Sequence, residues 1–289
     1  MFDIDIIDSK TSLGESGFYL YKTNEIVFLD LLHPHIFFYS IQTKKLNKIK
    51  LNLPKPLGNI YPLQNGKFII SCFNGLYLFN RKNNNLKHII DVRALGEKKD
   101  ISYNDGTITK DKLWIGLCHI KETDDLGYFG YFKNKKFYEI DRGFKVANGP
   151  AINEKKNKLY FSDSFNSSIY EYNLKNLKKK NVIKFNKKQG FPDGIALDNQ
   201  NGLWVAHWAG AQVSRINLKT SKIDLSIKIP ALNITSVTFV GKNLSHLFVT
   251  SAKIETPSNL LEKYNHSGSS FIIKTNYNGI RIPYSSMNF

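Results

Sequence analysis

The sequence predicts an all-β protein, a six-bladed β-propeller formed by a single domain over residues 1–289. Three observations predict this: six polar residues recur at a nearly constant interval, an apolar β-rich run follows each of them, and a second such run completes each unit. The recurring residues, which we call the polar ring, are Glu15, Asn59, Asn104, Asn148, Asp193 and Ser236. They lie 44, 45, 44, 45 and 43 residues apart. A period in the forties built from short strands is typical of propeller blades.

The first strand of each unit is expected to begin at the polar residue and to line the central channel. The apolar runs that follow 9 to 11 residues later occupy residues 26–30, 68–72, 113–117, 159–163, 203–207 and 247–251. A further run follows in every unit, at residues 36–39, 76–79, 128–131, 169–172, 213–216 and 271–274. Aromatic and β-branched residues dominate these runs, as expected of strands that pack between blades.

The N-terminus is expected to close the ring of blades. Phe2, Ile4 and Ile6 alternate with polar residues and predict a strand that precedes the first unit. The last unit ends in residues 280–284, and pairing of the N-terminal strand with the last blade would remove an open sheet edge.

Composition argues against nucleic-acid and membrane partners. The net charge is +17, but only 5 of the 41 basic residues are Arg, the residue favoured for bidentate phosphate recognition, so a solvated lysine-rich surface is the better interpretation. No apolar run approaches the roughly 18 residues that span a bilayer, and the N-terminus lacks signal-peptide features. Cys72 and Cys118 give no disulfide framework. We expect a cytoplasmic protein, a monomer or a weak homo-oligomer.

The polar ring predicts a metal site in the mouth of the channel. Five of its six members carry a carboxylate or carboxamide oxygen, and oxygen ligands without thiol or imidazole suit calcium, magnesium or manganese. The alternative is that these residues only form turns, which Asn and Asp also favour.

Six motifs resemble a known family. In chain order they are Leu13–Ser16 (LGES), Asn104–Gly106 (NDG), Ala147–Gly149 (ANG), Phe191–Asp198 (FPDGIALD), Gly202–Ala206 (GLWVA) and Thr235–Phe239 (TSVTF). At blade spacing and in this order, the motifs resemble those of the gluconolactonase and regucalcin family of sugar lactonases, also called the senescence marker protein family. The resemblance covers essentially the whole chain and implies a six-bladed propeller.

The resemblance also implies a site. The family's divalent metal ligands correspond here to Glu15, Asn148 and Asp193, and Asn104 would contact the substrate or the water on the metal. The family usually places an Arg two residues before that Asn to hold sugar hydroxyls. This chain has Ser102 there, so the resemblance implies the metal chemistry but not the usual sugar-acid specificity.

A second set of residues is expected near the same mouth. The last residues of the second strands include Asp163 and His207, and an antiparallel second strand returns to the end at which the first began. His207 is a candidate proton shuttle or substrate contact, because imidazole titrates near neutrality. The alternative is a histidine held by hydrogen bonds within its blade. Trp208 can stack on a sugar ring or pack between blades, and packing is the favoured interpretation.

These residues together predict metal-dependent hydrolysis of a lactone, such as an aldonolactone, to the hydroxy acid. One divalent ion is expected, calcium first and zinc, manganese, magnesium or iron as alternatives. Asp193 is the candidate general base, and no Gly-x-Ser-x-Gly elbow points to a serine hydrolase. Two alternatives are a propeller hydrolase acting on non-sugar lactones or esters, which Ser102 favours, and a non-catalytic metal-binding propeller.

Overall fold

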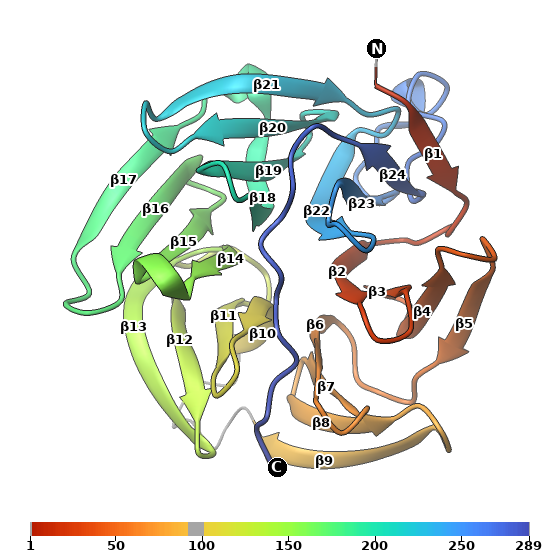
Figure 1. Cartoon of the computed structure of the whole chain (residues 1–289), viewed down its shortest axis with the longest axis vertical. Coiled ribbons are helices and arrows are strands. Elements are labelled where there is room, and N and C mark those ends of the chain that lie inside the picture. The colour runs from red at the N-terminus through yellow and green to blue at the C-terminus, as the bar shows by residue number, and fades with distance from the viewer. Residues whose placement is uncertain (1, 92–100, 289) are drawn as a thin grey trace.

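The computed structural model describes residues 2–91 and 101–288 and has six four-stranded antiparallel sheets arranged around a central channel (Figure 1). The six-bladed prediction is therefore confirmed. Among the described residues, the helical elements are three short 3-10 turns, Glu154–Lys156, Lys187–Gln189 and Ser258–Leu260. No helix in these two ranges is long and apolar enough to cross a membrane.

Each blade runs from an inner strand at the channel to an outer strand at the perimeter. The inner strands are β2 (Gly14–Leu20), β6 (Leu57–Pro62), β10 (Ile101–Ile108), β14 (Ala147–Asn153), β18 (Phe191–Leu197) and β22 (Asn233–Val240). The second strands are β3 (Glu25–Asp30), β7 (Phe68–Cys72), β11 (Leu113–His119), β15 (Lys158–Asp163), β19 (Gly202–Trp208) and β23 (His246–Ala252). The third strands are β4 (His35–Ser40), β8 (Gly75–Asn80), β12 (Gly127–Lys133), β16 (Ser168–Asn173), β20 (Gln212–Asn217) and β24 (Ser270–Lys274). The outer strands are β5 (Leu46–Lys50), β9 (Asn85–Asp91), β13 (Lys136–Phe144), β17 (Lys179–Lys184), β21 (Lys222–Lys228) and, in the sixth blade, β1 (Ile4–Ile7).

The N-terminal strand closes the ring as predicted. β1 pairs with β24 in antiparallel register, from Ile4 opposite Ile273 to Ile7 opposite Ser270. The expected apolar face is only partly right, because Ile6 is 44% exposed whereas Ile7 is buried.

The second strands are buried on both faces, since each blade packs between two neighbours. In β3, Ile26, Val27, Phe28 and Leu29 are completely buried, which explains why the runs read as continuously apolar rather than alternating. The outer strands face solvent and carry lysines, as β21 does with an almost alternating burial pattern. The lysines of the outer strands therefore place positive charge at the perimeter of the propeller, where water solvates it.

A β-bulge interrupts every inner strand at the polar ring. In each blade, two residues of the inner strand oppose one residue of the second strand. The breaks lie between Glu15 and Phe18, Leu57 and Ile60, Tyr103 and Gly106, Asn148 and Ala151, Pro192 and Ile195, and Ile234 and Val237. A bulge re-aims the side chains beside it, so the same local device recurs around the channel.

In two blades the hydroxyl of the opposing residue satisfies the backbone at the bulge. The Asn59 N–H donates to Ser71 Oγ at 2.7 Å, and the Ser236 N–H donates to Thr250 Oγ1 at 3.0 Å. Buried N–H groups released from the strand ladder need such partners.

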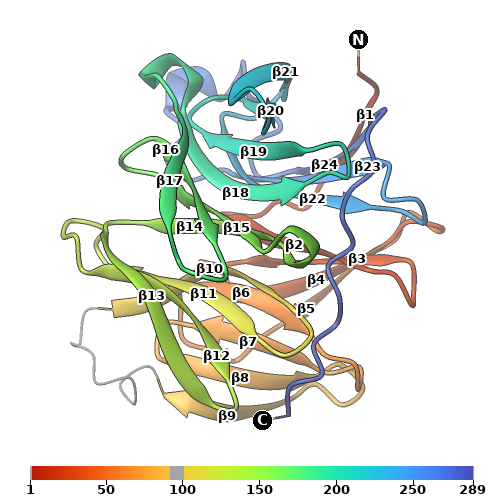
Figure 2. The same cartoon turned by 60° about the vertical axis from the view of Figure 1, so that its left-hand side comes forward.

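The C-terminal segment leaves the sixth blade and crosses the channel (Figures 1 and 2), where it meets the last residues of inner strands rather than the first. The Ile280 N–H donates to Leu197 O at 2.9 Å, and the Ser285 N–H donates to Pro62 O at 3.1 Å, so the segment contacts inner strands of two distant blades. Tyr284 is buried and stacks on Tyr21 with ring centres 4.3 Å apart. The expectation that residues 280–284 end the last blade is therefore wrong, because they lie across the channel instead.

Candidate functional site

Two cavities lie at opposite ends of the channel. The larger, about 610 Å³, lies beside the C-terminal segment and contains none of the predicted site residues. The smaller, about 340 Å³, is lined by Glu15, Asn104, Asn148 and Asp193. We place the candidate site in the smaller cavity because the ionisable and amide groups converge there, and size alone implies no chemistry.

The four predicted residues come from the inner strands of four blades, β2, β10, β14 and β18. Asn104 Nδ2 donates to Asn148 Oδ1 at 2.7 Å and to Ala147 O at 3.0 Å, which joins the third and fourth blades. Asn148 Nδ2 donates to Ser164 Oγ at 3.1 Å. The oxygen and the NH2 group of the Asn148 amide are therefore both held by hydrogen bonds, and the oxygen keeps a second lone pair for another partner.

A third carboxylate, Asp105, lines the cavity and is absent from the predicted set. Asn59 Nδ2 and the Gly106 N–H donate to Asp105 Oδ1 at 2.5 and 2.7 Å, so Asn59 of the polar ring serves to hold Asp105. Burial raises the pKa of Asp105 to about 7, although these donors oppose the shift. The sequence feature that could have indicated Asp105 is its place in the NDG motif. The bulge of β10 brings Asn104 and Asp105 to the same cavity.

The carboxylates of Glu15, Asp105 and Asp193 repel one another. Burial, followed by the charge of Asp105, raises the pKa of Glu15 well above its ordinary value. Burial also raises the pKa of Asp193, and the charges of Glu15 and Asp105 add to it. In the described part of the chain, no lysine, arginine or histidine forms an ion pair with any of the three. Buried carboxylates without a counter-charge are unfavourable, and a cation would relieve them.

The donor set fits a hard divalent cation. Across the described ranges, no three His, Cys, Asp or Glu side chains gather closely enough to hold a metal ion by themselves. A centre here therefore depends on the Asn148 amide oxygen together with Glu15 and Asp193. All three ligands would be oxygens, which calcium prefers over the sulfur and nitrogen sets typical of structural zinc.

Two predicted substrate contacts, Ser102 and His207, do not line this cavity. Ser102 is buried, and its hydroxyl donates to Tyr103 O at 3.2 Å. His207 is completely buried, with Nε2 2.6 Å from Ser214 Oγ and its ring edge-on to Phe185. In this arrangement neither side chain can touch a molecule in the cavity, which favours the alternative of a histidine held within its blade.

Other second-strand ends also close turns rather than border the cavity. Asp30 accepts hydrogen bonds from the backbone of Ser12 and His33, and Asp163 accepts them from the backbone and side chain of Asn166. The exception is Trp208, one residue beyond this register, which does line the cavity.

The buried His207 predicts a pH-dependent stability. Burial lowers the pKa of His207 from 6.5 to about 4, and nearby Lys228 adds to the shift. The His207 imidazole therefore binds a proton more readily in the unfolded chain than in the folded one. The contribution of neutral His207 to stability is full above pH 6.5 and is lost as the pH drops toward 4. The maximal loss is about 3 kcal/mol. We expect urea unfolding at pH 7 and 4 to show a larger stability loss in the wild type than in His207→Gln; equal losses would contradict the assignment.

The fold and the cavity together define a class: a six-bladed propeller that presents carboxylate and carboxamide groups at one mouth of its channel. Within this class, the chain belongs to the SMP-30/gluconolactonase/LRE-like family, whose family model matches residues 13–253. The family prediction is confirmed. A regucalcin of Danio rerio is 26% identical over 275 residues, covering 92% of each chain.

Two solved structures have the same fold. A luciferin-regenerating enzyme superposes with a TM-score of 0.90 at 23% identity, covering 99% of this chain and 100% of the other. A calcium-binding regucalcin of Agrobacterium tumefaciens superposes with a TM-score of 0.89 at 18% identity, covering 96% of each chain. At these identities the superpositions establish the shared fold and leave the chemistry to be argued from the residues.

Proposed function

We propose that this protein is a divalent-metal-dependent lactonase that opens a lactone to the hydroxy acid. The observation that carries the proposal is the convergence of Glu15, Asp105 and Asp193 with the Asn148 amide in one cavity, where Glu15 and Asp193 are buried and the described lining residues include no basic partner. Membership of a family whose description includes gluconolactonases supports it.

Glu15, Asn148 and Asp193 would hold the ion. When bound, a divalent cation polarises the lactone carbonyl and stabilises negative charge on its oxygen. Its positive charge would also return the pKa of Asp193 toward the ionised range, which a general base requires.

Asp193 is the proposed base. A water oxygen bonds to the carbonyl carbon while a carboxylate oxygen of Asp193 takes the water proton. The ring C–O bond then breaks, and the same proton passes to the leaving alkoxide, so lactone and water give one hydroxy acid. Asn104 holds the Asn148 amide through its 2.7 Å hydrogen bond and fixes the ligand geometry at no cost during the reaction.

Removing divalent ions is expected to abolish lactone hydrolysis. The reason is that the carboxylates alone offer no group that stabilises the oxyanion. The measurement is base consumption at constant pH with an aldonolactone, before chelation, after chelation and after return of calcium. Full turnover in a metal-free preparation would show that another mechanism operates.

A calcium-binding measurement beside the turnover assay separates the second candidate, a calcium-binding propeller without turnover. The Agrobacterium tumefaciens regucalcin, which shares this fold, is described as a calcium-binding protein, and this favours the second candidate. Calorimetric calcium binding with no lactone turnover on any tested lactone would select it.

A further inference from the structure

One side of the candidate cavity is aromatic. Phe165 lies in the turn between β15 and β16, Phe191 begins β18, and Trp208 ends β19; we call these three residues the aromatic wall. Phe191 and Trp208 face each other across the β18–β19 pair, so their side chains are direct neighbours. The wall therefore belongs to two adjacent blades and is held by strand register as well as by a turn.

Two residues of the aromatic wall belong to the few large apolar side chains that are exposed in the described ranges. Phe165 is 50% and Phe191 37% exposed. Large apolar side chains that are exposed in the described ranges are Ile6, Ile120, Leu126, Tyr138, Phe165, Leu177 and Phe191. Both phenylalanines of that set line this one cavity, although the chain contains 20 phenylalanines. Exposed apolar groups gathered at a cavity indicate a ligand that covers them.

The cavity is acidic in a basic protein. Its described lining includes five carboxylates, Glu15, Asp105, Glu122, Asp193 and Glu255, and no lysine, arginine or histidine, whereas the whole chain has a net charge of +17. A bound divalent ion would offset the charges of its proposed ligands Glu15 and Asp193, and the other three acidic residues of the lining, Asp105, Glu122 and Glu255, lie outside the ligand set. Lys145 approaches the rim, with Nζ 5.4 Å from the centre of the Phe165 ring, but is not part of the lining.

We propose that the substrate is an electrically neutral lactone that carries a flat apolar substituent, which packs against Phe165, Phe191 and Trp208. This inference rests on the proposed function and specifies its substrate class. The aromatic wall supplies apolar contact, and the carboxylates repel lactones that carry a carboxylate or phosphate group.

The same charges also favour release of product. Ring opening converts a neutral substrate into a hydroxy acid, whose new carboxylate is repelled by the carboxylates that remain. A polyhydroxylated sugar lactone gains less from the aromatic wall, because phenylalanine rings offer its hydroxyl groups no hydrogen bonds. At the position where the family usually has an Arg for such hydroxyls, Ser102 is buried and turned to its own backbone.

The test compares three lactones on the full-length protein with saturating calcium: dihydrocoumarin, glucono-δ-lactone and phosphogluconolactone. After subtraction of spontaneous hydrolysis, we expect kcat/KM for dihydrocoumarin to exceed that for glucono-δ-lactone by about tenfold or more. Phosphogluconolactone should be the poorest substrate. A preference for either sugar lactone overturns the proposal.

The variant Phe165→Ser/Phe191→Ser tests the wall directly. It should lower kcat/KM for dihydrocoumarin by about tenfold or more and change that for glucono-δ-lactone little. Leu177→Ser is the matched control, because Leu177 is 45% exposed but does not line the cavity. Equal losses on both lactones in the double variant would show that the aromatic wall does not bind the apolar substituent selectively.

A binding measurement separates this inference from the proposed function. Dihydroquinolinone is the lactam counterpart of dihydrocoumarin and resists hydrolysis. Calorimetry should show tighter binding of dihydroquinolinone than of gluconolactam, and the double Phe variant should remove the difference. If no lactone is turned over, the catalytic proposal fails while this result still decides the cavity's preference; equal binding of both lactams to the wild type overturns that preference.

Discussion

The Asp193→Asn variant is expected to lose lactone turnover by about 10²-fold or more, the usual effect of removing a general base. Asparagine keeps an oxygen ligand in nearly the same place within the β18 bulge but has no site that accepts the water proton. Asp193 is buried beside Glu15 and Asp105, so the substitution also relieves repulsion and should not unfold the protein. The measurement is kcat on the best lactone, with the metal content of each sample determined.

The comparison must be made at saturating metal, because a weakened site would imitate a catalytic loss. Asp163→Asn is the matched control: it replaces another buried aspartate, whose carboxylate closes a turn by accepting from Asn166. This control can reduce stability but should leave turnover per folded molecule close to normal. Near-normal turnover of Asp193→Asn under these conditions would reduce Asp193 to a ligand and require a different base.

The fold was predictable because two independent sequence patterns, the apolar runs and the polar ring, recur with the same period. The second strands read as continuous apolar runs since both faces are buried, and the polar ring recurs because every inner strand bulges at the same place. A bulge imposes a local requirement on the residues beside it, and the spacing of polar residues records that requirement. The period therefore located both the blades and the mouth of the channel.

Side-chain direction was less predictable. Counting positions placed His207 at the correct end of its strand, but strand pleating turns it into the blade, against Phe185 and Ser214. The next residue, Trp208, points into the cavity instead. Asp105 was missed for a related reason: one residue per blade was counted, although a bulge presents two.

The path of the C-terminal segment could not be derived from periodicity either. Its residues form no regular strand, and its position depends on contacts such as Ile280 with Leu197, which are distant in sequence. Loops of this kind are fixed by tertiary hydrogen bonds rather than by local propensity.

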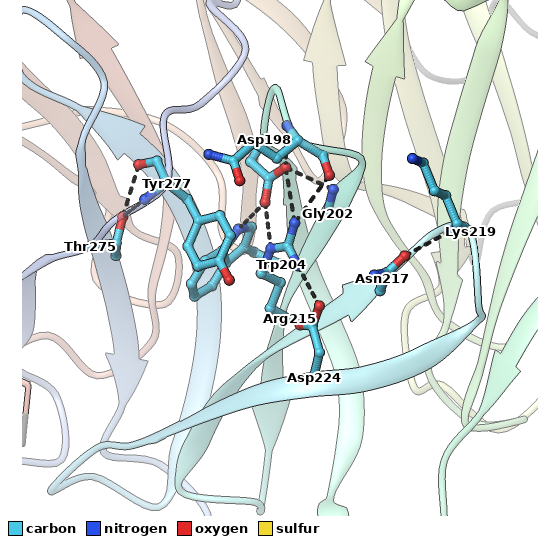
Figure 3. Close-up of polar contacts among 10 residues, drawn as sticks. Asp198, Gly202, Trp204, Arg215, Asn217, Lys219, Asp224, Thr275 and Tyr277 are labelled. Carbon is cyan, nitrogen blue, oxygen red and sulfur yellow. Dashed lines mark hydrogen bonds and ion pairs between the residues drawn. The ribbon is translucent and has the colours of Figure 1, made fainter.

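A buried ion pair in the fifth blade predicts the largest stability effect (Figure 3). Arg215 Nε donates to Asp198 Oδ2 at 2.6 Å, and Arg215 Nη1 donates to Asp224 Oδ2 at 2.5 Å. Asp198 also accepts from Trp204 Nε1 at 3.0 Å and from the Gly202 N–H at 2.7 Å. Arg215 and Asp198 are 3% and 2% exposed, so the two charges depend on each other.

Arg215→Met should lower the free energy of unfolding by about 3–5 kcal/mol, because it leaves the Asp198 carboxylate buried without its counter-charge. Combining it with Asp198→Asn should recover part of this loss, since no charge then remains buried. Arg142→Met is the control, because the Arg142–Glu139 pair is largely exposed and such pairs are worth up to about 1 kcal/mol. Urea unfolding of the four proteins measures these differences. The double variant decides the cause. If it is no more stable than Arg215→Met alone, the loss comes from packing of the arginine side chain rather than from the uncompensated charge. That packing includes the guanidinium group 4.1 Å above the centre of the Tyr277 ring.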